Sequence, residues 1–141
     1  MRAIILVGGF GTRLRPLTNE KPKQILNVGN KTMLENVIEN LSNHKVTEVI
    51  LSMGFQPSAF VDAYPNGMCG GLPLKYVVEP TPLDTAGAIG FSALKSSVNE
   101  TFLVCNGDVI AETDISELVD FHRDAGAEAT ISLTPTDNPS Q

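Results

Sequence analysis

The first long loop of the chain reads Leu6-Val-Gly-Gly-Phe-Gly-Thr-Arg-Leu-Arg-Pro-Leu-Thr18, and it follows an apolar run, residues 3–7, that is typical of a buried strand. In an open parallel sheet, ligands bind where the strands end. The glycines of this loop carry no Cβ and permit positive φ, so several backbone N–H groups can point at one anion. Two arginines in the same loop add positive charge. The loop is therefore predicted to bind a polyphosphate.

Two better-known glycine loops are excluded by the residues that follow. A dinucleotide-binding fingerprint requires a third glycine at position 14, where Leu14 stands. A Walker A loop requires Gly-Lys-Ser/Thr, and no such triplet follows Gly8. Both motifs lead directly into a helix, whereas Pro16 and Pro22 disfavour a helix across this segment. The loop is expected to be a long excursion that returns near Lys21-Pro-Lys-Gln24.

These residues resemble the pattern of a known family. The glycines, Thr12-Arg-Leu14, Pro16 and the later Lys21-Pro-Lys-Gln24 are similar to the signature of the sugar-1-phosphate nucleotidylyltransferases. The resemblance is closest to the mannose-1-phosphate guanylyltransferases and covers essentially the whole chain. It implies that an oxygen of a sugar 1-phosphate attacks the α-phosphorus of a nucleoside triphosphate and that pyrophosphate leaves. The alternative for the loop alone is a glycine-rich structural turn with solvated arginines.

Apolar runs that are typical of strands alternate with segments of helical periodicity along the chain. This alternation builds a parallel α/β sheet through crossover helices. We therefore expect a Rossmann-like parallel sheet with helices on both faces, in one nucleotidyltransferase domain that spans residues 1–141. The expected strands are residues 2–7, 48–53, 74–78, 101–105 and 129–133, and the expected helices begin near Thr32, Gln56, Thr85 and Asp114.

The composition narrows the class of partner. The 141 residues carry a net charge of −6, which argues against a general nucleic-acid surface, and no apolar run approaches the ~20 residues of a membrane span. Up to Lys31 there are six basic residues against one acid, and such a local basic patch favours a small anionic substrate. Cys69 and Cys105 show neither metal-ligand nor redox spacing, which suits a reducing compartment. We expect a cytoplasmic protein that binds neither nucleic acid nor membrane.

Asp108 is the candidate metal ligand. It follows the apolar run Phe102-Leu-Val-Cys-Asn106 and a glycine, so a strand would hold its carboxylate at the ligand edge of the sheet. Phosphoryl chemistry uses an oxygen ligand there for Mg²⁺, which bridges phosphate oxygens. Asn106-Gly-Asp-Val109 is similar to the metal-binding strand end of the family, which implies Mg²⁺ as the cofactor. An aspartate that caps its own turn is the structural alternative.

Glu79 bears on the choice of nucleotide. The resemblance implies that the position after the third strand contacts the base, and an ionised glutamate only accepts hydrogen bonds. Guanine offers two adjacent donors that one carboxylate can accept together, whereas thymine and uracil place an acceptor beside the ring N–H. This favours GTP. Two points leave the base open: Lys23-Gln24 is more typical of thymidylyl members, and a loop glutamate can simply be solvated.

The resemblance assigns roles to particular residues and requires no protein nucleophile, because such sites act by positioning and electrostatics. Arg13 is expected to clamp phosphate oxygens as a bidentate fork, and Lys23 to act as a mobile positive charge on the α-phosphate. Asp108 is expected to hold the metal. The expected nucleotide-binding residues are Leu6, Gly8, Gly9, Gly11, Thr12, Arg13, Lys23, Glu79, Thr85 and Gly87.

Two departures from the family pattern limit what the resemblance implies. Asp84 occupies a position where the family commonly shows Gly in Leu-Gly-Thr-Ala-Gly, which adds a charge and a Cβ near the nucleotide. Family catalytic domains also continue well beyond this length, with a sugar-binding half, a second metal carboxylate and a further Lys. We therefore expect an N-terminal portion that carries the nucleotide half-site. An open sheet edge at its last strand is expected to favour a homo-oligomer.

Three functions stay open on the sequence alone. The first is synthesis of a GDP-sugar from GTP and a sugar 1-phosphate, best matched by mannose 1-phosphate. The second is transfer from dTTP or UTP to glucose 1-phosphate. The third is an inactive fragment or regulatory module that keeps the triphosphate loop without the sugar half.

Overall fold

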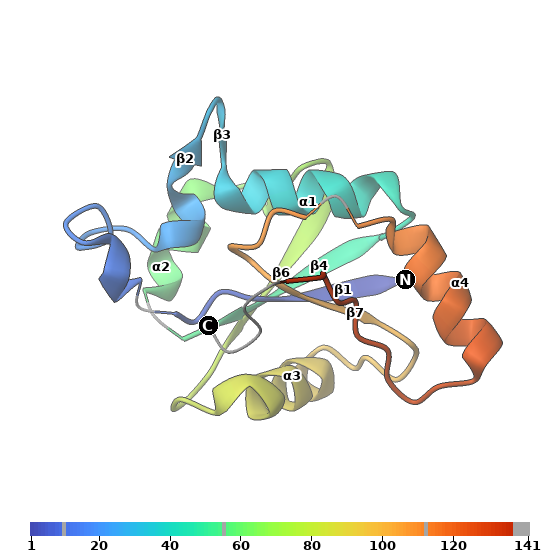
Figure 1. Ribbon diagram of the computed structural model, residues 1–141. Helices are drawn as coiled ribbons and strands as arrows, with labels where there is room; N and C mark the ends of the chain where they lie inside the picture. The colour runs from blue at the N-terminus through green and yellow to red at the C-terminus, as the bar shows by residue number, and fades with distance from the viewer. Residues whose placement is uncertain (10, 55, 112, 137–141) are drawn as a thin grey trace. The chain divides into compact units, whose positions relative to one another are not determined.

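Figure 1 shows the computed structural model of the chain, which describes residues 1–9, 11–54, 56–111 and 113–136. The chain divides into two compact units, residues 1–111 and 112–141. The first unit contains a sheet of five strands. Their spatial order is β5 (Met68–Cys69), β6 (Leu72–Val78), β4 (Glu48–Met53), β1 (Arg2–Leu6) and β7 (Leu103–Asn106).

The sheet is parallel except at one edge. β1 pairs in parallel with β4 on one side and β7 on the other, and β4 pairs in parallel with β6. The predicted parallel sheet is confirmed for these four strands. The short edge strand β5, which was not predicted, pairs antiparallel with β6. Gly70 and Gly71 join β5 to β6 at φ 54° and 81°, as a two-residue hairpin turn requires. The two glycines predict a loop, but a two-residue strand leaves no apolar pattern that would reveal the hairpin.

Helices cover both faces of the sheet, as predicted. Figure 1 shows α1 (Met33–Asn43) and α2 (Pro57–Ala63) on one face and α3 (Asp84–Lys95) on the other. Thr32 begins α1 with a capping box: its hydroxyl accepts from the Glu35 N–H at 3.0 Å, and its own N–H donates to the Glu35 carboxylate at 2.6 Å. None of the described helices has the length and hydropathy that crossing a bilayer requires.

The two faces of the strands build two layers of core. Ile4 on β1, Ile50 on β4 and Val77 on β6 form one buried cluster, and apolar side chains of α3 pack against it. On α1, the apolar residues recur at i, i+3, i+4 and i+7 and form the buried face of the helix. The buried residues of that stripe are Leu34, Val37, Ile38 and Leu41.

The second unit contains α4 (Ile115–Ala125) among its described residues. The helix begins at Asp114 as predicted, where the side chain accepts from the Glu117 N–H at 3.0 Å, and Gly126 ends it at φ 57°. The strand predicted at residues 129–133 is wrong: the described residues offer it no ladder partner, and Ile131 is 80% exposed. Alternating apolar residues create a strand only where a neighbouring strand accepts their backbone hydrogen bonds.

Gly107, directly after β7, lies where two parts of the backbone approach closely. Its N–H donates to the Leu6 carbonyl at 3.0 Å. A Cβ at this position would lie 2.7 Å from Cγ1 of Val7 and 3.1 Å from Cγ2 of Ile5. Both side chains are fully buried and β-branched, so they have little freedom to move aside. Glycine therefore lets the end of β7 dock against the end of β1.

We predict that Gly107→Ala lowers the free energy of unfolding by about 1–3 kcal/mol, because the added methyl overpacks this contact. Gly90→Ala on α3 is the matched control: nothing lies within 4 Å of a Cβ there, and alanine favours a helix by up to about 1 kcal/mol. Urea denaturation measures both variants. Equal effects of the two substitutions would contradict the close packing assigned to Gly107.

Candidate functional site

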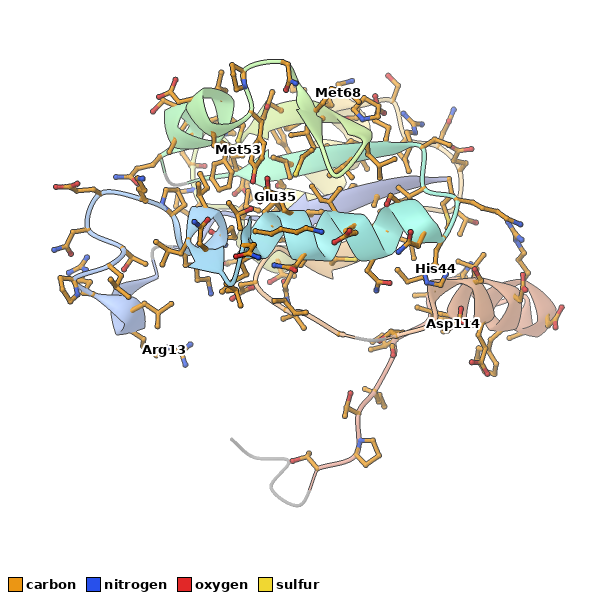
Figure 2. The ribbon with its side chains drawn as sticks, turned by 90° about the horizontal axis from the view of Figure 1, so that it is seen from above. Arg13, Glu35, His44, Met53, Met68 and Asp114 are labelled. Carbon is orange, nitrogen blue, oxygen red and sulfur yellow. The ribbon has the colours of Figure 1, made fainter. Side chains whose placement is uncertain are left out.

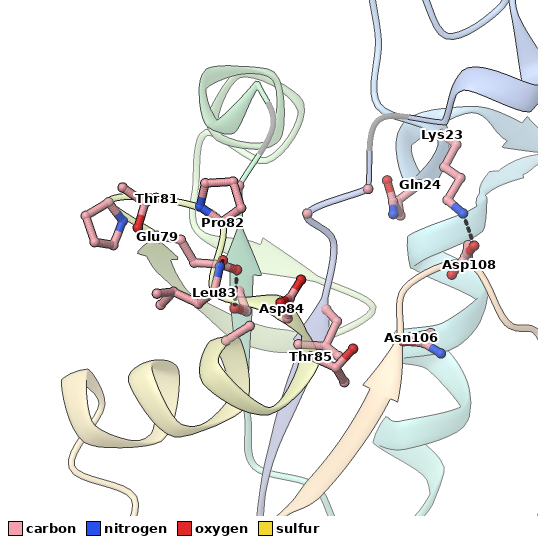
Figure 3. Close-up of a pocket in the computed structure, with 17 residues that line it drawn as sticks. Lys23, Gln24, Glu79, Thr81, Pro82, Leu83, Asp84, Thr85, Asn106 and Asp108 are labelled. Atoms are coloured by element: carbon pink, nitrogen blue, oxygen red, sulfur yellow. Dashed lines mark hydrogen bonds and ion pairs between the residues drawn. The ribbon is translucent and has the colours of Figure 1, made fainter.

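The carboxyl ends of β1, β4, β6 and β7 meet at one edge of the sheet, and the residues there line a cavity of about 580 Å³ (Figure 3). Hydrogen bonds continue the ladder past the strand ends. The Glu79 N–H donates to the Met53 carbonyl at 2.9 Å, and the Gly107 N–H donates to the Leu6 carbonyl. The first residues of these loops are thereby fixed by the sheet itself.

Many of the predicted site residues, but not all, are brought together in this cavity. Those that line it are Leu6, Gly8, Gly9, Lys23, Glu79, Thr85 and Asp108. Those that do not line it are Gly11, Thr12, Arg13 and Gly87. The lining also contains residues that were not predicted as site residues: Gln24, Ser52, Gly54, residues 80–84, Ala88 and Asn106. Ser52 and Gly54 lie at the end of β4, so the strand-end argument that found Asp108 could have found them.

The glycine loop begins beside Gly54, the residue that follows β4. A Cβ on Gly8 would lie 3.4 Å from the Gly54 nitrogen and 3.8 Å from Oε1 of Glu79. A Cβ on Gly9 would lie 4.0 Å from Cε of Lys23. Because neither glycine has a side chain, the backbone at this point remains open to the cavity. This arrangement is compatible with an anion on the backbone N–H groups.

The loop returns to its start, as predicted, but it carries Arg13 outward. Gly11 adopts φ 60°, and the Thr18 hydroxyl donates to its carbonyl at 2.8 Å. Short 3-10 turns at Thr12–Leu14 and Lys23–Ile25 take the place of a continuous helix. Figure 2 shows Arg13 on the part of the loop that lies outside the sheet, and the exposed side chain does not line the cavity. The phosphate clamp predicted for Arg13 is therefore not assembled at the cavity wall in this arrangement.

Lys23 and Asp108 form an ion pair at one end of the cavity, drawn as a dashed line in Figure 3. The contact joins Nζ of Lys23 to Oδ2 of Asp108, and the side chains are 24% and 28% exposed. Partial burial weakens the screening of such a pair by salt. The groups predicted to bind the α-phosphate and the metal therefore neutralise each other. A phosphate would bind Lys23, and a cation would bind Asp108, by replacing this partner.

Besides Asp108, two amide side chains of the cavity could contribute oxygen ligands to a metal ion. Asn106 and Gln24 line the same cavity as Asp108, and amide oxygens are suitable ligands. Oε1 of Gln24 has no hydrogen-bond partner among the described residues although the residue is only 1% exposed. Within the described residues, no group of three or more His, Cys, Asp and Glu could hold a metal. Phosphate oxygens would therefore have to complete the coordination, as is usual for Mg²⁺.

Glu79 organises the loop that follows β6. The Ser52 hydroxyl donates to its Oε1 at 3.3 Å, and the Leu83 N–H donates to its Oε2 at 3.2 Å. The carboxylate is therefore a bonded part of the cavity wall and is not simply solvated. Each oxygen keeps a further lone pair that a ligand could use. The role predicted for Glu79 in reading the base thus coincides with a role in holding residues 79–83.

Gly87 serves packing in α3. A Cβ there would lie 2.9 Å from Cβ of Leu83, which is too close for an unaltered loop. Since Gly87 does not line the cavity, its lack of a side chain lets the first turn of α3 approach the loop after β6.

The two cysteines do not supply a nucleophile to this site. Burial raises the pKa of Cys69 to about 11, and burial also raises the pKa of Cys105. Both thiols are consequently protonated at neutral pH, and neither lines the cavity. Among the described groups, the chemistry of the cavity comes from backbone amides, one ion pair, carboxylates, amide side chains and the hydroxyls of Ser52, Thr81 and Thr85.

Comparison with known proteins identifies related chains. The family model described as "Nucleotidyl transferase" matches residues 2–141. The chain is 42% identical over 146 residues to the "Probable mannose-1-phosphate guanylyltransferase 1" of Oryza sativa subsp. japonica. It is 40% identical over 144 residues to the "Mannose-1-phosphate guanylyltransferase catalytic subunit beta" of Dictyostelium discoideum. Both matches cover all of this chain, which spans 40% of the length of each relative.

The fold is shared with solved structures. One is HddC from Yersinia pseudotuberculosis complexed with GMP-PN, which superposes with a TM-score of 0.74 at 29% sequence identity. The match covers 87% of this chain and 54% of that chain.

We predict that a double-mutant cycle on Lys23→Met and Asp108→Asn gives a coupling energy of roughly 1 kcal/mol in the free energy of unfolding, because the pair is partly buried. The control cycle uses Lys31→Met and Glu39→Gln, a pair whose side chains are 48% and 50% exposed. Its coupling is expected to stay below about 0.5 kcal/mol. Zero coupling between Lys23 and Asp108 would show that they do not form a pair in solution.

Proposed function

The chain belongs to the nucleotidyl transferase family, and on this premise we propose that its cavity binds a nucleoside triphosphate, with GTP preferred. The nucleotidyl group is transferred to a sugar 1-phosphate, and mannose 1-phosphate is the preferred acceptor. Residues 1–141 carry the nucleotide-binding portion of the nucleotidyltransferase domain in this proposal.

One observation carries the proposal: a single cavity at the strand ends contains the open glycine loop, Lys23 and Asp108. The backbone at Gly8 and Gly9 suits phosphate oxygens, and the Lys23 ammonium suits the same oxygens as a point charge. Figure 3 shows Glu79 and Asp84 on the opposite side of the cavity from Lys23. Lys23 offsets the charge of Asp108, whereas neither Glu79 nor Asp84 forms an ion pair with a described residue. We therefore place the triphosphate toward Lys23 and the nucleoside toward Glu79.

The proposed reaction is an in-line displacement. A phosphate oxygen of the sugar 1-phosphate forms a bond to the α-phosphorus, and the bond between that phosphorus and the bridging oxygen breaks, releasing pyrophosphate. Lys23 leaves Asp108 and stabilises the negative charge on the α-phosphate. Asp108, with the amide oxygens of Gln24 and Asn106, would hold Mg²⁺, which neutralises phosphate charge when bound.

Two further points support GTP and mannose 1-phosphate. The two curated relatives carry the name mannose-1-phosphate guanylyltransferase, and the HddC structure is a complex with GMP-PN. Glu79 lines the cavity and has lone pairs left to accept from the two adjacent N–H donors of guanine.

Gln24 favours a second candidate, transfer from dTTP or UTP to glucose 1-phosphate. It is buried in the cavity beside Lys23, and the Lys-Gln pair resembles thymidylyl members.

We also propose a cytoplasmic location. The proposed substrates are nucleoside triphosphates and sugar phosphates, and Cys69 and Cys105 are free thiols, as a reducing compartment maintains.

We predict that GTP with Mg²⁺ raises the thermal midpoint of the 141-residue chain more than dTTP, UTP or ATP does. Ligand at 100 times Kd stabilises the native state by about 2.7 kcal/mol, which corresponds to roughly 5–10 °C for a chain of this size. Differential scanning fluorimetry measures the shift. Asp108→Asn is expected to remove most of the dependence on Mg²⁺. No shift with any nucleotide would contradict the proposed site.

We predict that Glu79→Gln reduces the preference for GTP over dTTP by roughly tenfold, because the neutral amide cannot accept from both donors of guanine. The measurement is the ratio of the two dissociation constants by calorimetry. Glu20→Gln is the charge-matched control, since Glu20 is exposed and does not line the cavity. An unchanged ratio in Glu79→Gln would show that Glu79 acts on the loop and not on the base.

A further inference from the structure

Asp84 is a carboxylate in the cavity that the proposed function has not used. It is the first residue of α3 and lines the cavity with Thr85. The cavity also shows a separate sign of a polar ligand, because the buried Oε1 of Gln24 lacks a partner among the described residues. A buried polar atom of this kind calls for a donor or a cation from outside the chain. Asp84 therefore lines a cavity that carries a separate sign of a ligand.

The backbone of Asp84 has a conformation that most side chains avoid. Its φ is 56°, in the left-handed region. Three other described non-glycine residues have positive φ: Lys45, Gln56 and Ser97. None of them lines the cavity. Glycine adopts this conformation without cost, whereas aspartate is one of the few other residues that tolerate it. The backbone conformation at this cavity position would also suit glycine, yet the residue there carries a carboxylate.

The Asp84 carboxylate is available to a ligand. Its neighbour Glu79 already accepts from the Ser52 hydroxyl and the Leu83 N–H. Among the described residues, nothing donates a hydrogen bond to Asp84 or forms an ion pair with it. The side chain is exposed at the cavity surface. It therefore offers two acceptor oxygens to whatever the cavity binds.

The location of Asp84 in the cavity indicates which part of a bound nucleotide would lie beside it. Figure 3 shows Asp84 between Glu79 and the end of β1, which leads into the glycine loop. With phosphates on the glycine loop and the base toward Glu79, the ribose lies between them. A carboxylate repels phosphate oxygens but accepts from neighbouring hydroxyl groups. The ribose hydroxyls are the donors that fit this place.

We propose that Asp84 accepts hydrogen bonds from the ribose hydroxyls of the bound nucleoside triphosphate and thereby selects ribonucleotides over 2′-deoxyribonucleotides. This inference rests on the proposed function of the cavity. It makes Asp84 a specificity-determining residue that favours GTP and UTP over dTTP. The structural alternative is that Asp84 only stabilises the N-terminus of α3 by its negative charge.

The test compares the dissociation constants of GTP and 2′-deoxy-GTP, each with Mg²⁺, in wild type and in Asp84→Asn. Asparagine also tolerates positive φ, so the variant keeps the backbone while it loses the charge. Wild type is expected to prefer GTP by about tenfold or more, and Asp84→Asn is expected to lose most of this preference. Both ligands carry the same phosphates, so a general change in electrostatics cancels in the ratio.

Asp62→Asn on α2 is the matched control, because Asp62 is exposed and does not line the cavity. Its ratio is expected to equal that of wild type. A ratio that stays the same in Asp84→Asn, with or without a lower thermal midpoint, overturns the inference and leaves the proposed function intact. A change confined to the ratio of GTP to ITP would place Asp84 at the base and also overturn it. Failure of wild type to bind any nucleotide would instead contradict the proposed function itself.

Discussion

The parallel pairing of β1 with β4 on one side and β7 on the other determines where the candidate functional groups lie. Parallel strands end at the same edge of a sheet, so the glycine loop, Gly54 and Asp108 arrive there together. The close packing of Gly107 against Val7 fixes where the chain leaves β7, and so fixes the position of Asp108 relative to β1. Without these two ladders, residues 9 and 108 would have no common surface.

The groups at this edge are held by one another. Lys23 contacts Asp108, and Glu79 holds both Ser52 and the Leu83 N–H. In the Lys23–Asp108 contact, a phosphate could replace Asp108 and a cation could replace Lys23. The bonds of Glu79, in contrast, join groups that shape the cavity wall. A polyphosphate can therefore replace contacts at one end of the cavity without disturbing the loop at the other. This division gives the cavity one end with an exchangeable ion pair and one end with two carboxylates, which orient a nucleotide.

Hydrophobic periodicity and the positions of glycine, proline and helix-capping residues in the sequence predict much of this arrangement. The apolar runs locate β1, β4, β6 and β7, and the position of Asp108 after a strand places it in the cavity. Features that depend on tertiary contacts were not accessible: the hairpin of β5, the lack of a ladder partner for residues 129–133, and the outward course of the loop with Arg13. The positive φ of Asp84 was not predicted either, because aspartate occurs at negative φ as well and its identity alone does not fix the backbone angle.

The central claim is that a triphosphate occupies the strand-end cavity, and a ¹⁵N-resolved NMR titration of the chain with GTP and Mg²⁺ tests it most directly. Glycine amides resonate in a separate region of the spectrum, and the chain carries them both inside and outside the cavity. The account predicts that the amides of Gly8, Gly9 and Gly54 shift on titration, while those of Gly29 and Gly126 stay in place. Shifts at Gly29 or Gly126 with none at Gly8 and Gly9 would contradict it.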